Sequence, residues 1–130
     1  MSFEWSEYIV LAHELAGSLS PTVSQASASP ECKYRCAISR AYYGAFGAAL
    51  QFWNQGQPES PVPENGTAHI LLQRRFRKRG LPHGREIAAN LGRLHTNRLA
   101  ADYKNEVGNV AETLRTSLTM AERVLNSLGA

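Results

Sequence analysis

The stretch CAISRAYYGAFGAALQF, residues 36–52, carries two stripes of residues that together predict the fold class. One stripe is small and the other apolar. Both repeat every three or four positions, so they lie along one helix of roughly 3.6 residues per turn. Small side chains allow neighbouring helices to approach closely, and we therefore expect the central helix of a packed bundle. The small residues are Ala37, Ala41, Ala45 and either Ala48 or Ala49, and the apolar ones are Ile38, Tyr42, Phe46, Ala49 and, one position beyond the stretch, Trp53.

A third face of the same helix carries Arg40, Tyr43 and Gly47, again by three- and four-residue spacing. One interpretation is a surface arginine that lies over a tyrosine. The other is a cleft, because a charge among so many small and aromatic residues is expected to pair or to meet a ligand. In the second case Arg40 lines the cleft, and Tyr42 and Tyr43 support it.

Helices are expected on both sides of this one. Ser29, followed by Pro30, is typical of an N-cap with proline in the first turn. No strand pattern competes, so we expect an all-α bundle of four or five helices, formed by residues 1–130 as one domain. The expected helices cover residues 6–19, 30–53, 67–80 and 85–104, and a last one follows the apolar seam Val107, Ala111, Leu114, Leu118, Ala121, Leu125 and Leu128.

Composition favours a globular protein, since 43% of the 130 residues are hydrophobic. No apolar run approaches the roughly 20 residues that cross a bilayer, and the N-terminal stretch lacks the basic region of a signal peptide. We expect a cytoplasmic, prokaryotic protein that does not bind membranes. Cys32 and Cys36 are expected to be partly buried thiols, without a disulfide or a zinc site. No metal or other cofactor is expected.

Positive charge is concentrated between residues 65 and 98, where eight arginines and lysines face only Glu86. Such asymmetry favours polyanions as partners. The densest run is RRFRKR, residues 74–79, in which we expect Phe76 to be a core residue. A solvated helix face would explain the run, but phosphate contact would relieve the repulsion among its cations. The candidate phosphate- and RNA-binding residues are Arg74, Arg75, Arg77, Lys78 and Arg79.

The segment RLHTNRLAADYK, residues 93–104, concentrates polar side chains on one expected helix. Arg98 and Asp102 are four apart and can pair, and His95 shares a face with Arg98. Tyr103 lies about 140° around the helix from Arg98, so both can flank one cleft but are not expected to touch unaided. A polar stripe that stabilises a helix pair is the alternative interpretation.

These segments resemble a known family. SPECKYRCAISRAYYGAFGAAL, residues 29–50, resembles the second helix of small prokaryotic HEPN-domain proteins, which carry a stretch like S-R-A-Y-Y-A-A-F. HILLQRRFRKRGLP and NRLAADYK resemble the family's third helix and its R-x-x-A-D-Y segment. The resemblance implies a four- to five-helix bundle, usually a homodimer. Many members are metal-independent ribonucleases, often toxins paired with a nucleotidyltransferase-like antitoxin, or parts of defence systems.

The resemblance also implies a catalytic motif, an arginine with a histidine after roughly four to six residues, and two copies meet at the dimer cleft. Arg98 matches the arginine, but Tyr103 stands where the shortest motif has histidine, and no histidine follows. Gly47 stands where the family often has histidine. Tyrosine, with an ordinary pKa near 10, is a poor general base at neutral pH.

Two functions are therefore expected, with a purely structural interaction protein as a weaker third. The first is a HEPN-type module that binds RNA, a nucleotide or a nucleotidyltransferase-like partner, with weak or no catalysis. The alternative is a metal-independent ribonuclease with an atypical site. In that case Arg98 and Arg40 act with Tyr103 or His95, and Asp102 supports the cleft.

Overall fold

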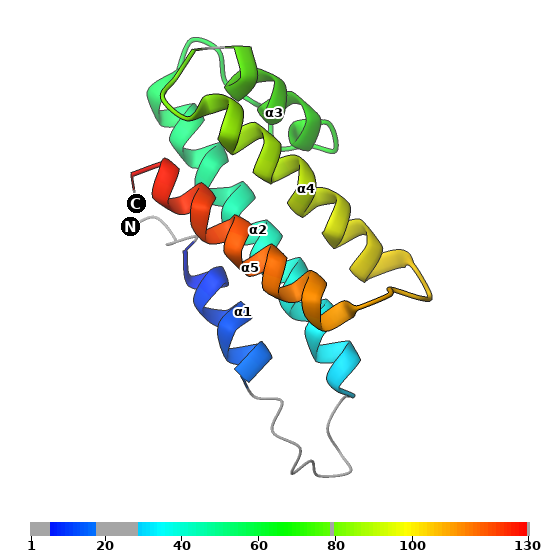
Figure 1. Cartoon of the computed structure of the whole chain (residues 1–130). Coiled ribbons are helices and arrows are strands. Elements are labelled where there is room, and N and C mark those ends of the chain that lie inside the picture. Colours follow the sequence, from blue (N-terminus) through cyan, green and yellow to red (C-terminus); the bar gives the residue numbers. More distant parts are fainter. Residues whose placement is uncertain (1–5, 18–28, 79, 130) are drawn as a thin grey trace.

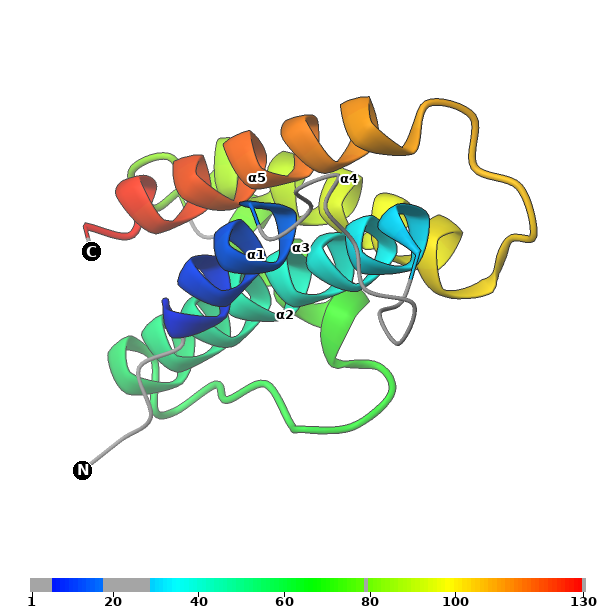
Figure 2. The ribbon, with the colours of Figure 1, turned by 90° about the horizontal axis from the view of Figure 1, so that it is seen from below.

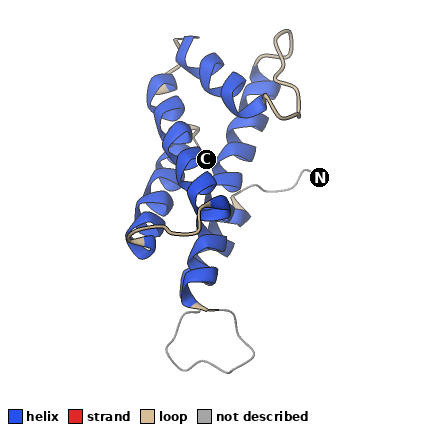
Figure 3. Cartoon of the chain, turned by 90° about the vertical axis from the view of Figure 1, so that its right-hand side faces the viewer, coloured by secondary structure: helices blue, strands red, loops and turns tan. Residues whose placement is uncertain are grey.

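The computed structural model describes residues 6–17, 29–78 and 80–129, and within them every regular element is an α-helix (Figure 3). The prediction of an all-α bundle is confirmed. No helix in the described ranges is long and apolar enough to cross a membrane. The helices, in chain order, are α1 (Glu7–Gly17), α2 (Pro30–Gly56), α3 (Ala68–Lys78), α4 (Gly84–Tyr103) and α5 (Val110–Ser127) (Figure 1).

α2 is the centre of the bundle, because it contacts all four other helices (Figure 1). It is 27 residues long and buries the small stripe predicted for it. Ala37, Ala41, Ala45 and Ala49 have no exposed surface at all. Tyr42 and Trp53, the two largest side chains of the neighbouring stripe, are each only 1% exposed. The helix begins as expected, since the Ser29 hydroxyl accepts a hydrogen bond from the Cys32 amide.

α2 ends later than predicted, at Gly56, and the segment after it is fastened back onto the helix. The Trp53 indole N–H donates to the Ser60 carbonyl over 2.8 Å. The Asn54 side chain bonds both backbone groups of Val62, accepting from the N–H at 2.8 Å and donating to the carbonyl at 3.2 Å. The segment runs along the side of the molecule opposite α5 (Figure 2).

Arg35 joins the C-terminal end of α4 to α2. Its guanidinium donates to the carbonyls of Ala101, Lys104 and Asn105 at 3.0, 2.6 and 3.1 Å. A helix leaves its last carbonyls without partners, and these three bonds satisfy carbonyls at and just beyond the end of α4. The polar residues near that end, among them Arg98, are therefore held at a fixed place against α2.

α5 begins at Val110, later than the predicted seam, because Asn109 caps it by accepting from the Glu112 amide at 3.1 Å. Val107 therefore precedes the helix. Further along the seam Leu114, Leu118 and Ala121 are buried, as expected of a face that packs on α2 and α4. The predicted partial burial of Cys32 and Cys36 is wrong: both thiols are exposed, on a face of α2 away from the buried alanines.

The corner between α3 and α4 depends on backbone shape. Gly80 and His83 both have positive φ, 68° and 60°, and α4 begins directly after His83. Phe76 is 1% exposed, which confirms it as a core residue. A Cβ atom on Gly84 would lie 2.5 Å from the Phe76 carbonyl oxygen, so α3 and α4 can only meet this closely at a glycine.

We expect Gly84→Ala to lower the free energy of unfolding by about 1–3 kcal/mol, because backbone must move to admit the new Cβ atom. Gly92→Ala is the matched control on the same helix, since its Cβ would meet only the mobile Gln73 side chain, at 3.2 Å. Alanine also favours a helix interior, so the control should be neutral or stabilising. Urea unfolding measures both, and equal losses would contradict the close approach at Gly84.

Candidate functional site

Three rings from three helices converge on one side of α2. The Tyr42 hydroxyl is hydrogen-bonded to Nδ1 of His69, from α3. The His69 ring stacks on His95, from α4, with centroids 4.9 Å apart and planes 8° from parallel. Tyr42 also contacts the His95 ring, at 5.4 Å. We call Tyr42, His69 and His95 the tyrosine–histidine cluster.

Burial shapes the proton equilibria of the cluster. Burial raises the pKa of Tyr42 well above its ordinary value, although the positive charge of Arg98 opposes the shift. Burial also lowers the pKa of His69, and repulsion from a protonated His95 and from Arg98 lowers it further. The pKa of His95 is lowered by burial first and by Arg98 second. At pH 7 the cluster therefore holds a neutral phenol and two neutral imidazoles.

The Tyr42–His69 bond selects the tautomer of His69. The phenol is buried and keeps its proton, so its O–H donates and Nδ1 accepts. A neutral imidazole has one N–H, which then lies on Nε2. In the described part of the chain, this Nε2–H and the His95 ring have no hydrogen-bond partner. Both histidines thus have a ring nitrogen available to a ligand.

Arg98 lies beside the cluster and is held by the next turn of α4. Its Nε is 3.0 Å from Oδ2 of Asp102, which confirms that the two residues pair. The Asp102 carboxylate also accepts a 3.5 Å bond from the Ser39 hydroxyl of α2. The Arg98 side chain is 13% exposed. Asp102 pairs with Nε by charge, without the geometry of a hydrogen bond, and the two terminal nitrogens of the guanidinium have no hydrogen-bond partner among the described residues, so they remain for an anion.

Tyr43 lies between two arginines. The guanidinium carbon of Arg98 is 5.0 Å from the centre of its ring, and that of Arg40 is 5.5 Å away. The same carbon of Arg98 is 5.8 Å from the centre of the Tyr103 ring, so the charge of Arg98 also lies near Tyr103. The Arg98 side chain is long enough to approach Tyr103 although the two residues lie on different faces of the helix. Tyr103 is 72% exposed, so it stands at the rim of the site.

The predicted cleft residues of α2 and α4 therefore occupy one neighbourhood, but sequence reasoning missed His69. This histidine follows Ala68, where α3 begins, and stands next to the buried stripe formed by Ala68, Leu72 and Phe76. A histidine beside an apolar helix face was the available signal. It names no partner, because Tyr42 and His95 belong to other helices.

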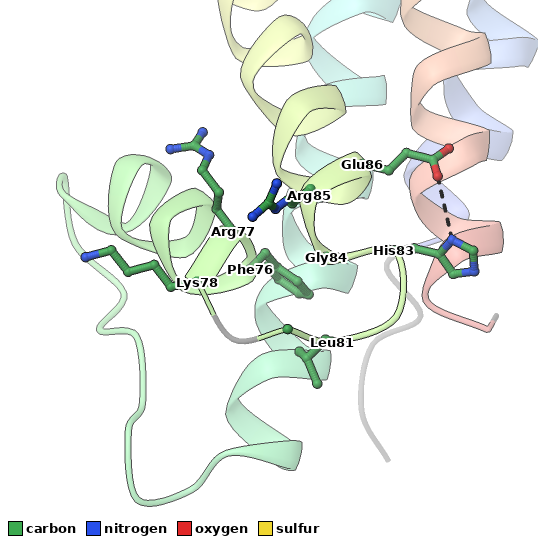
Figure 4. Close-up of a pocket in the computed structure, with 9 residues that line it drawn as sticks. Phe76, Arg77, Lys78, Leu81, His83, Gly84, Arg85 and Glu86 are labelled. Atoms are coloured by element: carbon green, nitrogen blue, oxygen red, sulfur yellow. Dashed lines mark ion pairs between the residues drawn. The ribbon is translucent and has the colours of Figure 1, made fainter.

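The basic segment forms a separate surface. Arg77 and Lys78 of α3 line a pocket of about 330 Å³ at the α3–α4 corner, together with Arg85 of α4, and none of the cluster residues lines it. Figure 4 shows Arg85 reaching toward α3, whereas His83 turns aside toward Glu86. Arg74 is exposed as well.

Two residues of the predicted phosphate-binding set differ from the rest. Arg75 turns toward the segment before α3, where its guanidinium donates to the Ser60 carbonyl at 2.7 Å and to the Ser60 hydroxyl. It thereby fastens α3 to that segment. Arg79 lies outside the described residues. Phosphate contact by Arg74, Arg77 and Lys78 stays a prediction.

The arrangement of the site offers acid–base and anion-binding groups. Among the described residues, no three histidine, cysteine, aspartate or glutamate side chains are grouped in a way that could hold a metal ion. Comparison with known proteins adds no assignment: no family model matches the chain, and no match is found among curated proteins or solved structures.

The lowered pKa values make a prediction about stability. An unfolded histidine has a pKa near 6.5, so as the pH falls through 6.5 the unfolded chain binds protons that the folded His69 and His95 do not yet bind. The free energy of unfolding should therefore fall between pH 7.5 and 5.5. Urea unfolding should show a smaller fall for His69→Gln and the smallest for the double variant with His95→Gln. Identical pH dependence in all three proteins would contradict the burial of these rings.

Proposed function

We propose that this chain is a HEPN-type domain that cleaves RNA without a metal ion, at a site formed by His95, His69 and Arg98. The observation that carries the proposal is the pair of neutral, stacked histidines beside a held arginine. The objection to catalysis was that no histidine follows Arg98. That objection loses force because His95 precedes Arg98 by one helical turn and His69 comes from another helix.

Cleavage by the 2′-hydroxyl of RNA needs a base for that hydroxyl, positive charge on the phosphate and a proton for the leaving oxygen. His95 fits the first need, because its lowered pKa keeps it neutral at pH 7. The hydroxyl proton passes to His95 as O2′ attacks phosphorus and the bond to O5′ breaks. The resulting imidazolium is acidic for the same reason, and it returns the proton to O5′. The products are a 2′,3′-cyclic phosphate and a 5′-hydroxyl.

Arg98 and His69 act on the phosphate in this proposal. The terminal nitrogens of Arg98 bind phosphate oxygens, while the ion pair with Asp102 keeps the guanidinium at the site. His69 donates a hydrogen bond from Nε2–H without giving up its proton. Tyr42 is a positioning residue, since its bond to Nδ1 fixes the tautomer that places this N–H outward.

The proposal includes a homodimer, as the resemblance implies. Two exposed apolar side chains support it: Ile70, 56% exposed, directly follows His69, and Leu99, 40% exposed, directly follows Arg98. Large apolar side chains next to a polar site are typical of a surface that meets a partner. A nucleotidyltransferase-like antitoxin belongs to the same proposal and rests on the resemblance alone.

RNA binding without cleavage is the second candidate function. It is supported by the cationic pocket of Arg77, Lys78 and Arg85, which lies apart from the tyrosine–histidine cluster. Phosphates bound there would hold RNA on the protein whether or not the cluster is catalytic.

Purified protein should cleave single-stranded RNA in EDTA and leave 2′,3′-cyclic phosphate ends. His95→Gln and Arg98→Ala should each lower the rate by about 10²-fold or more, because they remove the base and the positive charge. The wild-type rate should hold as the pH falls through 6.5 and decline only in more acidic buffer, because the pKa of His95 is lowered. Arg123→Ala, which removes an exposed charge from α5, is the control. Absence of cleavage from pH 5 to 9 would leave only the binding function.

Charge reversal should separate binding from catalysis. Arg77→Glu combined with Lys78→Glu should weaken binding to single-stranded RNA of any sequence. The log–log dependence of affinity on salt should become shallower by roughly 0.7 for each phosphate that the variant no longer binds. Binding can be followed by fluorescence anisotropy in the His95→Gln background, in which cleavage is expected to be slow, with Arg123→Glu as the control. An unchanged salt dependence would identify the basic run as a solvated helix face.

A further inference from the structure

A second pocket adjoins the tyrosine–histidine cluster. It has a volume of about 320 Å³ and lies between α2, the start of α3 and the segment that joins them. Its aromatic walls come from Tyr43, Phe46 and His69, and the rings of Phe46 and His69 lie 4.6 Å apart. Gly47, which is buried and has no side chain, leaves the α2 side of the pocket open. Aromatic walls around an open space suit a flat, aromatic ligand.

The polar groups of this pocket lie at its outer side, on the segment that precedes α3. Glu64 is exposed and presents a carboxylate, which accepts hydrogen bonds only. Asn65 accepts bonds through Oδ1 from the Thr67 amide at 2.9 Å and the Thr67 hydroxyl at 2.6 Å. The orientation of the amide is therefore fixed, and its Nδ2 donor remains for a ligand. Glu64 and Asn65, which are neighbours in the sequence, thus add a carboxylate acceptor and an amide donor to the lining of the pocket.

One nucleobase matches that pair of groups. The Watson–Crick edge of guanine carries, in order, the N2 amino donor, the N1–H donor and the O6 acceptor. A carboxylate can accept from both donors while an amide donates to O6. Adenine and cytosine have an unprotonated acceptor nitrogen where guanine has N1–H, and that nitrogen would face the carboxylate without a hydrogen bond. Uracil has a single N–H between two carbonyls, so it offers the carboxylate one donor where guanine offers two.

The positive and negative side chains around this pocket are also arranged as a bound nucleotide would require. Tyr43 lines this pocket, and its ring lies 5.0 Å from the guanidinium carbon of Arg98 and 5.5 Å from that of Arg40. The cations are thus on the Tyr43 side of the pocket, and the Glu64 carboxylate is on the joining segment. A nucleotide carries its anionic phosphate and its base edge at opposite ends, in the same order.

We propose that this pocket is a nucleobase subsite that selects guanine, so that a phosphate attached to the bound guanosine meets Arg98. The proposal deepens the proposed function and takes its RNA substrate from it. The binding of a free nucleotide, however, requires no cleavage, so the two can be tested apart.

Calorimetric titration with 3′-GMP, 3′-AMP, 3′-CMP and 3′-UMP tests the pocket directly. We expect the wild-type protein to bind 3′-GMP at least 10-fold more tightly than the others. Glu64→Gln should abolish this preference, because an amide places a donor against the donors of guanine. Glu64 is exposed, so the variant should fold normally. Glu14→Gln, an exposed glutamate of α1, is the matched control and should keep the preference.

Cleavage of a mixed-sequence oligonucleotide in EDTA supplies the second measurement. Cuts next to guanosine should dominate for the wild type and lose their dominance in Glu64→Gln. Guanine-selective binding without any cleavage would support the pocket and refute the catalytic proposal. Cleavage without guanine preference, in binding and in cut sites alike, would overturn the pocket and leave the catalytic proposal intact. Light scattering adds one further check. If the wild type is a dimer and Glu64→Gln is a monomer, the nucleobase subsite is refuted, because the pocket would then hold a side chain of a second copy.

Discussion

The buried hydroxyl of Tyr42 is the constraint on which the rest of the site depends. α2 places this residue at the centre of the bundle, where a polar atom without a partner is costly to bury. The only compensation in the described chain comes from His69 of α3, so the position of α3 and the orientation of that ring are set together. The ring then stacks on His95, and the proximity of Arg98 helps burial to keep both imidazoles neutral. A packing requirement of the core thus determines the protonation state of surface-accessible groups.

Periodicity was sufficient to predict the helices, because each buried stripe repeats within one continuous segment. The alanine face of α2, the Phe76 position and the Arg98–Asp102 pair all follow from three- and four-residue spacing. The same reasoning could not find His69, since its partners are 27 and 26 residues away on other helices. It also could not show that the Arg98 charge comes near Tyr103, because a backbone angle says little about the reach of a long side chain. Bonds from Arg35 to the end of α4 were equally hidden, as they cross 66 to 70 residues.

In this chain the histidines near Arg98 do not stand where a sequence motif would place them. The resemblance to HEPN-domain proteins directs attention to residues after Arg98, whereas the imidazoles near Arg98 lie one turn before it and on α3. On a helix, residues three positions before and four positions after a given residue are both its neighbours. The order of residues therefore does not decide whether base and cation meet. The cleavage proposed above requires a neutral imidazole near a positive charge, and that condition concerns distance and burial.

The way in which the segment between α2 and α3 is held has a consequence for how the chain can evolve. Trp53, Asn54 and Arg75 hold it through the backbone of Ser60 and Val62, bonds that survive most changes of side chain along the segment. Residues 63–66 therefore follow a segment that is held in place, and they are exposed, so they contribute little to the core. Asn65 forms a turn with Thr67. Substitutions there can change the side chains at the edge of the pocket while the tyrosine–histidine cluster stays intact. Descendants of one ancestral bundle could in this way vary the lining of the pocket without passing through unfolded intermediates.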